Sequence, residues 1–215
     1  KMLLAQEMSY KAFNTGKTPE QTLAPTFEQQ VAITQALNFL FTPHTSKEGD
    51  NIFFLEGSPG SGKTQVVVKY IIDLYKRIKG VEQPKLYALG HTSRASKAIT
   101  KTVFGEERST SVEEFLAQDL NEIDILVIDE APAFKSADMD HIKYAVEQHN
   151  KKGKHKIKIL AFGDPAQITS SDFFEINSTT EKYTHVANPL TVVYRTNVAS
   201  ITDFFMQFKF KSSFL

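Results

Sequence analysis

A glycine-rich stretch constrains the fold of this chain more than any other feature. Residues 57–64 read GSPGSGKT, which is the pattern G-x-x-x-x-G-K-T. The apolar run NIFFLE just before it predicts a short buried strand. After it, apolar residues recur at helical spacing, at Val67, Tyr70, Ile71, Leu74 and Ile78. A strand, a glycine-rich loop and a helix in this order predict a P-loop, which is a phosphate-binding turn.

The residue types in this loop match the chemistry of a nucleoside triphosphate. Glycines allow backbone N–H groups to turn inward around phosphate oxygens, and the next helix points its positive end at them. Lys63 would supply a mobile charge to the β- and γ-phosphates, and Thr64 would offer its hydroxyl to Mg²⁺. The remaining contacts to ATP are predicted for Gly57, Ser58, Pro59, Gly60, Ser61 and Gly62. The alternative is an ordinary glycine-rich turn with a surface lysine.

Two adjacent acids follow a second apolar run, ILVIDE. Ligands of parallel sheets gather at the carboxyl ends of the strands, so this position suits a metal-holding acid. Asp129 is therefore predicted to hold Mg²⁺, directly or through water, and Glu130 to polarise the water that attacks the γ-phosphate. The alternative is an acidic turn after a strand.

Strand-like and helix-like segments alternate from residue 51 to residue 165. The runs KLYALG, IDILVIDE and KIKILAFGD are apolar and short, and helix-like segments separate them. Uniformly apolar strands alternating with helices predict an α/β fold with a parallel sheet covered by helices on both faces. The run GDPAQI after the last strand places Gln167 where its amide would contact the γ-phosphate or its water, or else face solvent.

Composition excludes several classes of protein. Twenty-five basic and 25 acidic residues leave a formal net charge of zero, so the chain does not have the strongly basic character that marks many nucleic-acid binders. There is no cysteine, which excludes disulfides and thiolate metal sites and fits a reducing compartment. No apolar run approaches the ~20 residues that span a bilayer. We therefore expect no membrane contact and a cytoplasmic or other intracellular location.

Taken together, the motifs resemble the first RecA-like domain of superfamily 1 helicases, of the RecD and Dda type. GSPGSGKT, DEAP and GDPAQI stand in the order of motifs I, II and III of that superfamily. FEQQVA resembles its glutamine motif, which implies that Gln29 reads adenine, although Gln29 also fits a capping box at the start of a helix. ALGHTSRASKAI resembles motif Ia, which implies contacts to single-stranded nucleic acid from His91, Thr92, Ser93 and Arg94; these residues also fit a helix cap facing water.

The resemblance extends to YRTN, which is similar to motif IV. It implies that Arg195 is an arginine finger and that Tyr194 stacks on the adenine, with a surface arginine and a core tyrosine as the alternatives. The expected organisation is a lead-in at 1–25, a RecA-like ATPase domain at 26–190, and a segment at 191–215 leading to a second RecA-like domain. One departure is SVEEFL, in which Glu113 stands where relatives carry a histidine.

The function implied is that of a helicase or translocase motor domain. It would hydrolyse ATP with Mg²⁺ while acting on single-stranded nucleic acid, with DNA favoured over RNA, and the domain alone would not unwind a duplex. Two alternatives remain open at this point. One is a PhoH-like P-loop ATPase, which shares the P-loop and the DEA and GD motifs. The other is a nucleotide-dependent switch or interaction module without motor activity.

Overall fold

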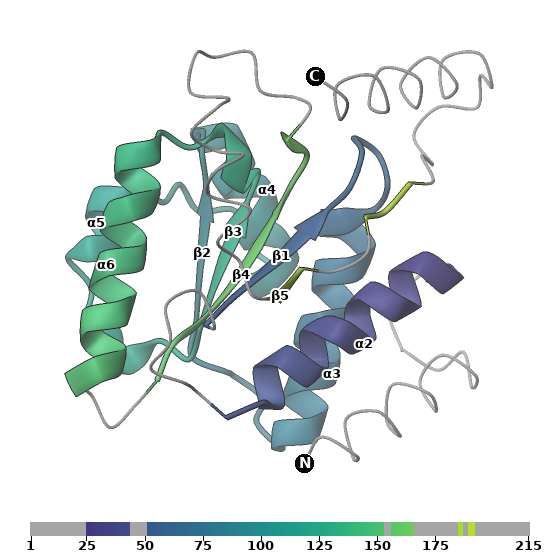
Figure 1. Ribbon diagram of the computed structural model, residues 1–215, viewed down its shortest axis with the longest axis horizontal. Helices are drawn as coiled ribbons and strands as arrows, with labels where there is room; N and C mark the ends of the chain where they lie inside the picture. Colours follow the sequence, from purple (N-terminus) through teal and green to yellow (C-terminus); the bar gives the residue numbers. More distant parts are fainter. Residues whose placement is uncertain (1–24, 44–50, 153–155, 166–184, 187–188, 192–215) are drawn as a thin grey trace.

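A parallel sheet forms the centre of the molecule (Figure 1). The computed structural model describes residues 25–43, 51–152, 156–165, 185–186 and 189–191. The sheet has five strands in the order β2-β3-β4-β1-β5, and every pair is parallel. The strands are β1 (Ile52–Glu56), β2 (Leu86–Gly90), β3 (Ile125–Asp129), β4 (Lys158–Gly163) and β5 (His185–Val186).

Helices connect the strands and cover both faces of the sheet. The α-helices are α2 (Phe27–Phe41), α3 (Lys69–Lys79), α4 (Ser93–Phe104), α5 (Val112–Leu116) and α6 (Ser136–Lys152). A π-helix, Lys63–Val68, precedes α3, and two short 3₁₀ helices occupy Leu120–Glu122 and Ala131–Ala133. None of these helices is long and apolar enough to cross a membrane within the part of the chain that the structure describes.

Alternate side chains of each strand enter two separate hydrophobic cores. Phe53 and Leu55 of β1 pack in one core, together with α2, α3 and α4. Ile52 and Phe54 of the same strand point to the other face and pack with α5 and α6. This alternation follows from the two-residue period of a strand. Figure 1 accordingly shows α6 on one side of the sheet and α2 and α3 on the other. The α/β fold with helices on both faces is therefore confirmed.

The structure differs from the sequence-based expectation in three local features. The helix after the glycine-rich loop begins with π-helical hydrogen bonding over Lys63–Val68. The helix α5 and the two-residue strand β5 were not predicted, because both are too short to show a hydrophobic period. The apolar spacing of Phe27, Val31, Ile33, Ala36, Leu37 and Leu40 predicts a helix with these residues on its buried face, but Phe27 is 79% exposed. At about 100° per residue it lies roughly 130° from the centre of the face formed by Ile33, Ala36, Leu37 and Leu40.

A buried lysine joins the sheet to the end of α2. Lys158 is the first residue of β4 and is 3% exposed. Its ammonium donates to the carbonyls of Phe39 and Thr42, where α2 ends, and lies 4.6 Å from the centre of the Phe39 ring. Carbonyls at a helix C-terminus favour a positive charge. Burial acts in the opposite direction and lowers the pKa of Lys158 to about 8.

Candidate nucleotide-binding and catalytic site

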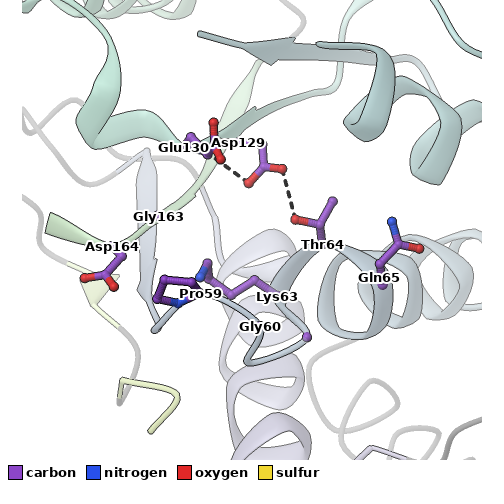
Figure 2. A pocket seen from close by; sticks show the side chains of 10 residues that line it. Pro59, Gly60, Lys63, Thr64, Gln65, Asp129, Glu130, Gly163 and Asp164 are labelled. Carbon is purple, nitrogen blue, oxygen red and sulfur yellow. Dashed lines mark hydrogen bonds between the residues drawn. The ribbon is translucent and has the colours of Figure 1, made fainter. Parts of the chain in front are cut away.

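The carboxyl ends of the strands meet at one edge of the sheet, and the candidate site lies there. In the register of the sheet, Glu56 at the end of β1 lies beside Gly163 at the end of β4, and Gly90 beside Asp129. The loops that follow these strands enclose a cavity of about 150 Å³ (Figure 2). Its lining consists of Pro59, Gly60, Gly62, Lys63, Thr64, Gln65, Asp129, Glu130, Gly163 and Asp164.

The glycine-rich loop adopts a conformation that only glycine accommodates easily. Gly60 and Gly62 have φ angles of 78° and 80°, in the left-handed region that side chains rarely enter. Lys63 lines the cavity, and its Nζ donates to the carbonyls of Gly57 and Ser58, the latter at 2.9 Å. The ammonium group is thus held within the loop itself, next to the backbone that would surround phosphate oxygens.

A hydroxyl and a carboxylate from distant parts of the sequence meet beside the loop. Thr64 Oγ1 donates to Asp129 Oδ2 at 2.9 Å, and Figure 2 shows the two side chains facing each other. Asp129 is 6% exposed, and burial raises the pKa of its carboxyl above the ordinary value, whereas the bond from Thr64 acts to lower it. Hydroxyl and carboxylate oxygens are the ligands that Mg²⁺ prefers, so these two residues fit a magnesium site completed by phosphate oxygens.

Glu130 lines the cavity and lies on the far side of Asp129 from Thr64 (Figure 2). Its backbone N–H donates to Asp129 Oδ1 at 3.0 Å. Its φ angle is 53°, the one left-handed value at a non-glycine residue among those that the structure describes. Backbone strain of this kind tends to occur at functional sites. The Glu130 carboxylate is in contact with His91, with Oε2 at 2.7 Å from Nδ1.

Gln29 contacts the loop but is enclosed by protein. Its Oε1 accepts from the N–H of Thr26 at 2.9 Å, which is the reciprocal half of a capping box. Its Nε2 donates to the carbonyl of Ser61 at 2.8 Å, and the residue is 3% exposed. Both ends of the amide are thus bonded to protein. The structure supports the capping interpretation of Gln29 and adds a contact to the loop that the sequence did not suggest.

The segment at 91–94 lies on the surface, at the start of α4. His91, Thr92, Ser93 and Arg94 are all exposed, and Thr92 Oγ1 caps the helix by accepting from the N–H of Ala95 at 3.2 Å. The expected helix cap is therefore present at Thr92. The other three side chains remain at the surface beside it.

An open groove of about 630 Å³ lies along the exposed face of α4. Its lining consists of Gln65, Ser93, Arg94, Lys97, Ala98, Lys101 and Glu107. Gln65 also lines the cavity beside the glycine-rich loop, so the groove and the cavity are neighbours. Lys97 and Lys101 were not among the predicted site residues. The spacing of Arg94, Lys97 and Lys101 on one helix face, at i, i+3 and i+7, is the signal that could have indicated them.

Three predicted site residues, Gln167, Tyr194 and Arg195, lie outside the described residues. Residues 189–191, which precede Tyr194 and Arg195, are described, and they contact the glycine-rich loop. Leu190 pairs with Gly57, donating to the carbonyl of Glu56 at 2.9 Å and accepting from the N–H of Ser58 at 3.2 Å. The Glu28 carboxylate accepts from the backbone N–H of Thr191 at 3.0 Å and from its hydroxyl at 2.6 Å.

Comparison with known proteins agrees with this geometry. The family described as AAA domain matches residues 45–172, which is more than half of the chain. No curated protein sequence matches the chain.

Three solved Pif1 helicase structures share the fold. The Bacteroides Pif1 helicase in complex with ADP-AlF3 and ssDNA is 19% identical, with a TM-score of 0.52, and the match covers 87% of this chain and 46% of that one. A structure on DNA unwinding at forked dsDNA by two coordinating Pif1 helicases is also 19% identical, with a TM-score of 0.51 and coverage of 86% and 48%. Bacteroides Pif1 bound to ssDNA is 17% identical, with a TM-score of 0.51 and coverage of 87% and 46%.

This chain therefore spans a little less than half of the length of those Pif1 proteins. Their similarity confirms the RecA-like α/β fold that the motifs predicted. With the P-loop, the buried Asp129 and the parallel sheet in place, the chain belongs to the AAA domain family.

Proposed function

We propose that this chain is a motor domain that hydrolyses ATP and couples the reaction to single-stranded nucleic acid. The observation that carries the proposal is the 2.9 Å bond between Thr64 and Asp129 at the wall of the cavity. It joins the end of the P-loop to the end of a buried strand, which are the two places where P-loop enzymes hold Mg²⁺.

The loop backbone, Lys63, Thr64, Asp129 and Glu130 each have a role that fits this reaction. Backbone N–H groups of the loop bind the phosphates, and Lys63 exchanges its contacts to the Gly57 and Ser58 carbonyls for β- and γ-phosphate oxygens. Thr64 and Asp129 hold Mg²⁺, which when bound neutralises charge that develops on the γ-phosphate. Glu130 accepts a proton from the attacking water. The described residues contain no group of three or more histidine, aspartate or glutamate side chains that could hold a metal ion.

The groove on α4 supports nucleic acid as the second ligand. Arg94, Lys97 and Lys101 place three cations along it, against one acid, Glu107. Phosphate contacts of this kind give affinity without sequence preference. The related fold in Bacteroides Pif1 was solved with ADP-AlF3 and ssDNA together, which is consistent with a strand and a nucleotide on neighbouring surfaces.

The remaining roles rest on the motif resemblance. We propose that Gln167 contacts the γ-phosphate or its water, and that Arg195 acts as an arginine finger while Tyr194 stacks on adenine. Leu190 and Thr191 lie against the P-loop and α2, so the chain that leads to Tyr194 and Arg195 starts beside the nucleotide site. A second RecA-like domain would supply the opposite wall of the site, as the partial coverage of the Pif1 structures suggests.

Steady-state ATP hydrolysis tests the proposal, with and without the oligonucleotide dT15. Lys63→Ala should abolish hydrolysis and weaken ATP binding. Glu130→Gln should keep Mg-ATP binding while hydrolysis falls by about 10²–10⁴. Lys151→Ala, on the exposed end of α6, is the matched lysine control and should behave like the parent.

The same assay separates the motor from other P-loop proteins. Stimulation of the parent by dT15 is expected of the motor. Turnover without stimulation would point to a P-loop ATPase of another kind, and binding without turnover to a nucleotide-dependent switch. Equal hydrolysis by Lys63→Ala and the parent would refute the site itself.

A further inference from the structure

Leu190 lies beside the start of the glycine-rich loop and is fixed there by its backbone. It pairs with Gly57 in a parallel bridge, which continues the pairing of β5 with β1. Its N–H donates to the carbonyl of Glu56 at 2.9 Å, and its carbonyl accepts from the N–H of Ser58 at 3.2 Å. A Cβ on Gly57 would lie 3.0 Å from the Cβ of Leu190, so the glycine allows the two segments to approach this closely.

The next residue, Thr191, is held by a side chain from α2. Glu28 Oε2 accepts from the backbone N–H of Thr191 at 3.0 Å, and Glu28 Oε1 accepts from its hydroxyl at 2.6 Å. Both oxygens of one carboxylate thus bind one residue, although the two residues are 163 positions apart. Hydrogen bonds to an ionised acceptor are roughly twice as strong as neutral ones. The contact therefore fixes the chain shortly before Tyr194 and Arg195.

Consecutive residues of α2 hold both the loop and the segment at 190–191. Gln29 donates to the carbonyl of Ser61 at 2.8 Å, while Glu28 binds Thr191. The helix itself is a firm support, because Ile33 and Leu37 are fully buried in the core under the sheet. The start of α2 thereby fixes the tip of the P-loop and the chain beside its first residues relative to each other.

We propose that Glu28 is a positioning residue, which holds the chain leading to Tyr194 and Arg195 against the P-loop. With Thr191 bound to α2, that chain starts at a fixed place beside the phosphates. When the carboxylate is removed, Thr191 loses both of these hydrogen bonds and Arg195 reaches the γ-phosphate less often. This inference rests on the proposed function and identifies the residue that places the arginine finger.

The length of the intervening chain makes this anchor effective. Four residues of extended chain reach at most about 14 Å, so the Cα of Arg195 stays within that distance of the Cα of Thr191. The anchor also lies next to the proposed phosphate site, because the carbonyl of Ser58 accepts from Lys63 Nζ at 2.9 Å. A fixed Thr191 therefore limits Arg195 to the neighbourhood of the nucleotide.

The rate of hydrolysis at saturating ATP tests the inference. Glu28→Ala should lower kcat by about tenfold, because a tether favours the held position by no more than the free energy of its hydrogen bonds. A poorer adenine contact by Tyr194 would raise KM and leave kcat unchanged, so kcat reports on Arg195. Glu147→Ala, a partly buried glutamate on α6, is the matched control and should behave like the parent.

Substitutions of Thr191 approach the same contact from its other side. Thr191→Ser keeps the N–H and the hydroxyl and should keep the parent kcat. Thr191→Val keeps only the N–H donor, so its kcat should lie between those of the parent and Glu28→Ala. A kcat equal to that of the parent in both Glu28→Ala and Thr191→Val would overturn the inference.

A double-mutant cycle with Arg195→Ala distinguishes positioning from general damage to the fold. If Glu28 acts through Arg195, Glu28→Ala should have no further effect on kcat once Arg195 is alanine. A tenfold loss that persists in the Arg195→Ala background would overturn the inference, because Glu28 would then affect hydrolysis by another route.

Hydrogen exchange tests the tether without nucleotide. The Thr191 amide should exchange at least about tenfold faster in Glu28→Ala than in the parent, because its N–H loses its acceptor. The Leu190 amide, bonded to Glu56, should change less and serves as the internal reference. Equal exchange of Thr191 in both proteins would overturn the inference. Absence of hydrolysis in the parent under all conditions would instead refute the proposed function, and the exchange of Thr191 would still decide whether Glu28 holds this chain.

Discussion

The side chain of Gln29 donates a 2.8 Å hydrogen bond to the carbonyl of Ser61, so that the first described helix holds the tip of the P-loop. The two residues are 32 positions apart in the sequence. The same amide accepts from Thr26 at 2.9 Å and thereby closes the start of α2. One buried side chain thus connects a helix cap with a phosphate-binding loop.

Replacement of Gln29 should lower the stability of the fold. Gln29→Ala leaves the Thr26 N–H and the Ser61 carbonyl without their partner in a buried place, and such losses amount to about 1–3 kcal/mol. Urea denaturation followed by circular dichroism measures this difference. Gln30→Ala, one residue along on the more exposed side of α2, is the control and should have a smaller effect. A role of Gln29 in reading adenine predicts in addition a loss of preference for ATP over GTP.

Gly62→Ala should destabilise the P-loop through two separate effects. The φ angle of 80° is strained for alanine, and the new Cβ would lie 2.6 Å from Nε2 of Gln29. Gly80→Ala is the matched control, because its φ is 70° but no atom lies within 4 Å of the added Cβ. We expect Gly62→Ala to lower the free energy of unfolding by about 1 kcal/mol more than Gly80→Ala.

A double mutant separates strain from overlap at Gly62. Once Gln29 is alanine, the Cβ at position 62 no longer meets its amide. The double mutant should therefore lose less free energy of unfolding than the sum of the losses in the two single mutants. Full additivity would show that backbone strain alone accounts for the loss.

The groove on α4 should contribute a measurable share of the salt dependence of oligonucleotide binding. Lys97→Ala and Arg94→Ala should each weaken binding of dT15 and reduce the slope of log K against log salt by about 0.7, the value for one phosphate contact on a single strand. Fluorescence anisotropy at several salt concentrations measures the slope. Lys151→Ala is the control for loss of one positive charge elsewhere. Equal slopes in all variants would remove the groove from the path of the strand.

Stability should rise with pH above about pH 8 because of Lys158. Burial lowers the pKa of this lysine to about 8 from 10.5, so between these values the unfolded chain binds more protons than the folded one. Stability therefore increases with pH in that window, by at most about 1.4 kcal/mol per pH unit. Below pH 8 both states carry the charge and the effect is constant.

The comparison with Lys158→Met isolates this contribution. The free energy of unfolding of the parent should rise relative to the variant from pH 8 to pH 9.5, as measured by urea denaturation. This range lies below the ordinary pKa of 10.0 for tyrosine, above which Tyr75, whose pKa is raised by burial, acts in the opposite direction. Parallel pH profiles for parent and variant would show that the carbonyls of Phe39 and Thr42 keep Lys158 charged.

Much of the local structure was predictable because short-range patterns determine it. The strands β1 to β4 and the helix α4 lie where apolar runs and helical spacing placed them. The cap at Thr92 likewise follows from local residue types. Phe27 shows the limit of this approach, because apolar character suggested a buried side chain while the geometry of the helix directs it outward.

The sequence by itself determined the elements, their order and the loop that binds phosphate, since each depends on neighbours within a few residues along the chain. Only the tertiary structure decided which side chains meet. Thr64 and Asp129 are 65 residues apart, and Gln29 and Ser61 are 32 residues apart. Contacts of this range depend on the strand order β2-β3-β4-β1-β5 and on its register, which place Gly90 beside Asp129 and therefore His91 beside Glu130. The order and register arise from packing of the two cores as a whole, and no local pattern in the sequence encodes them.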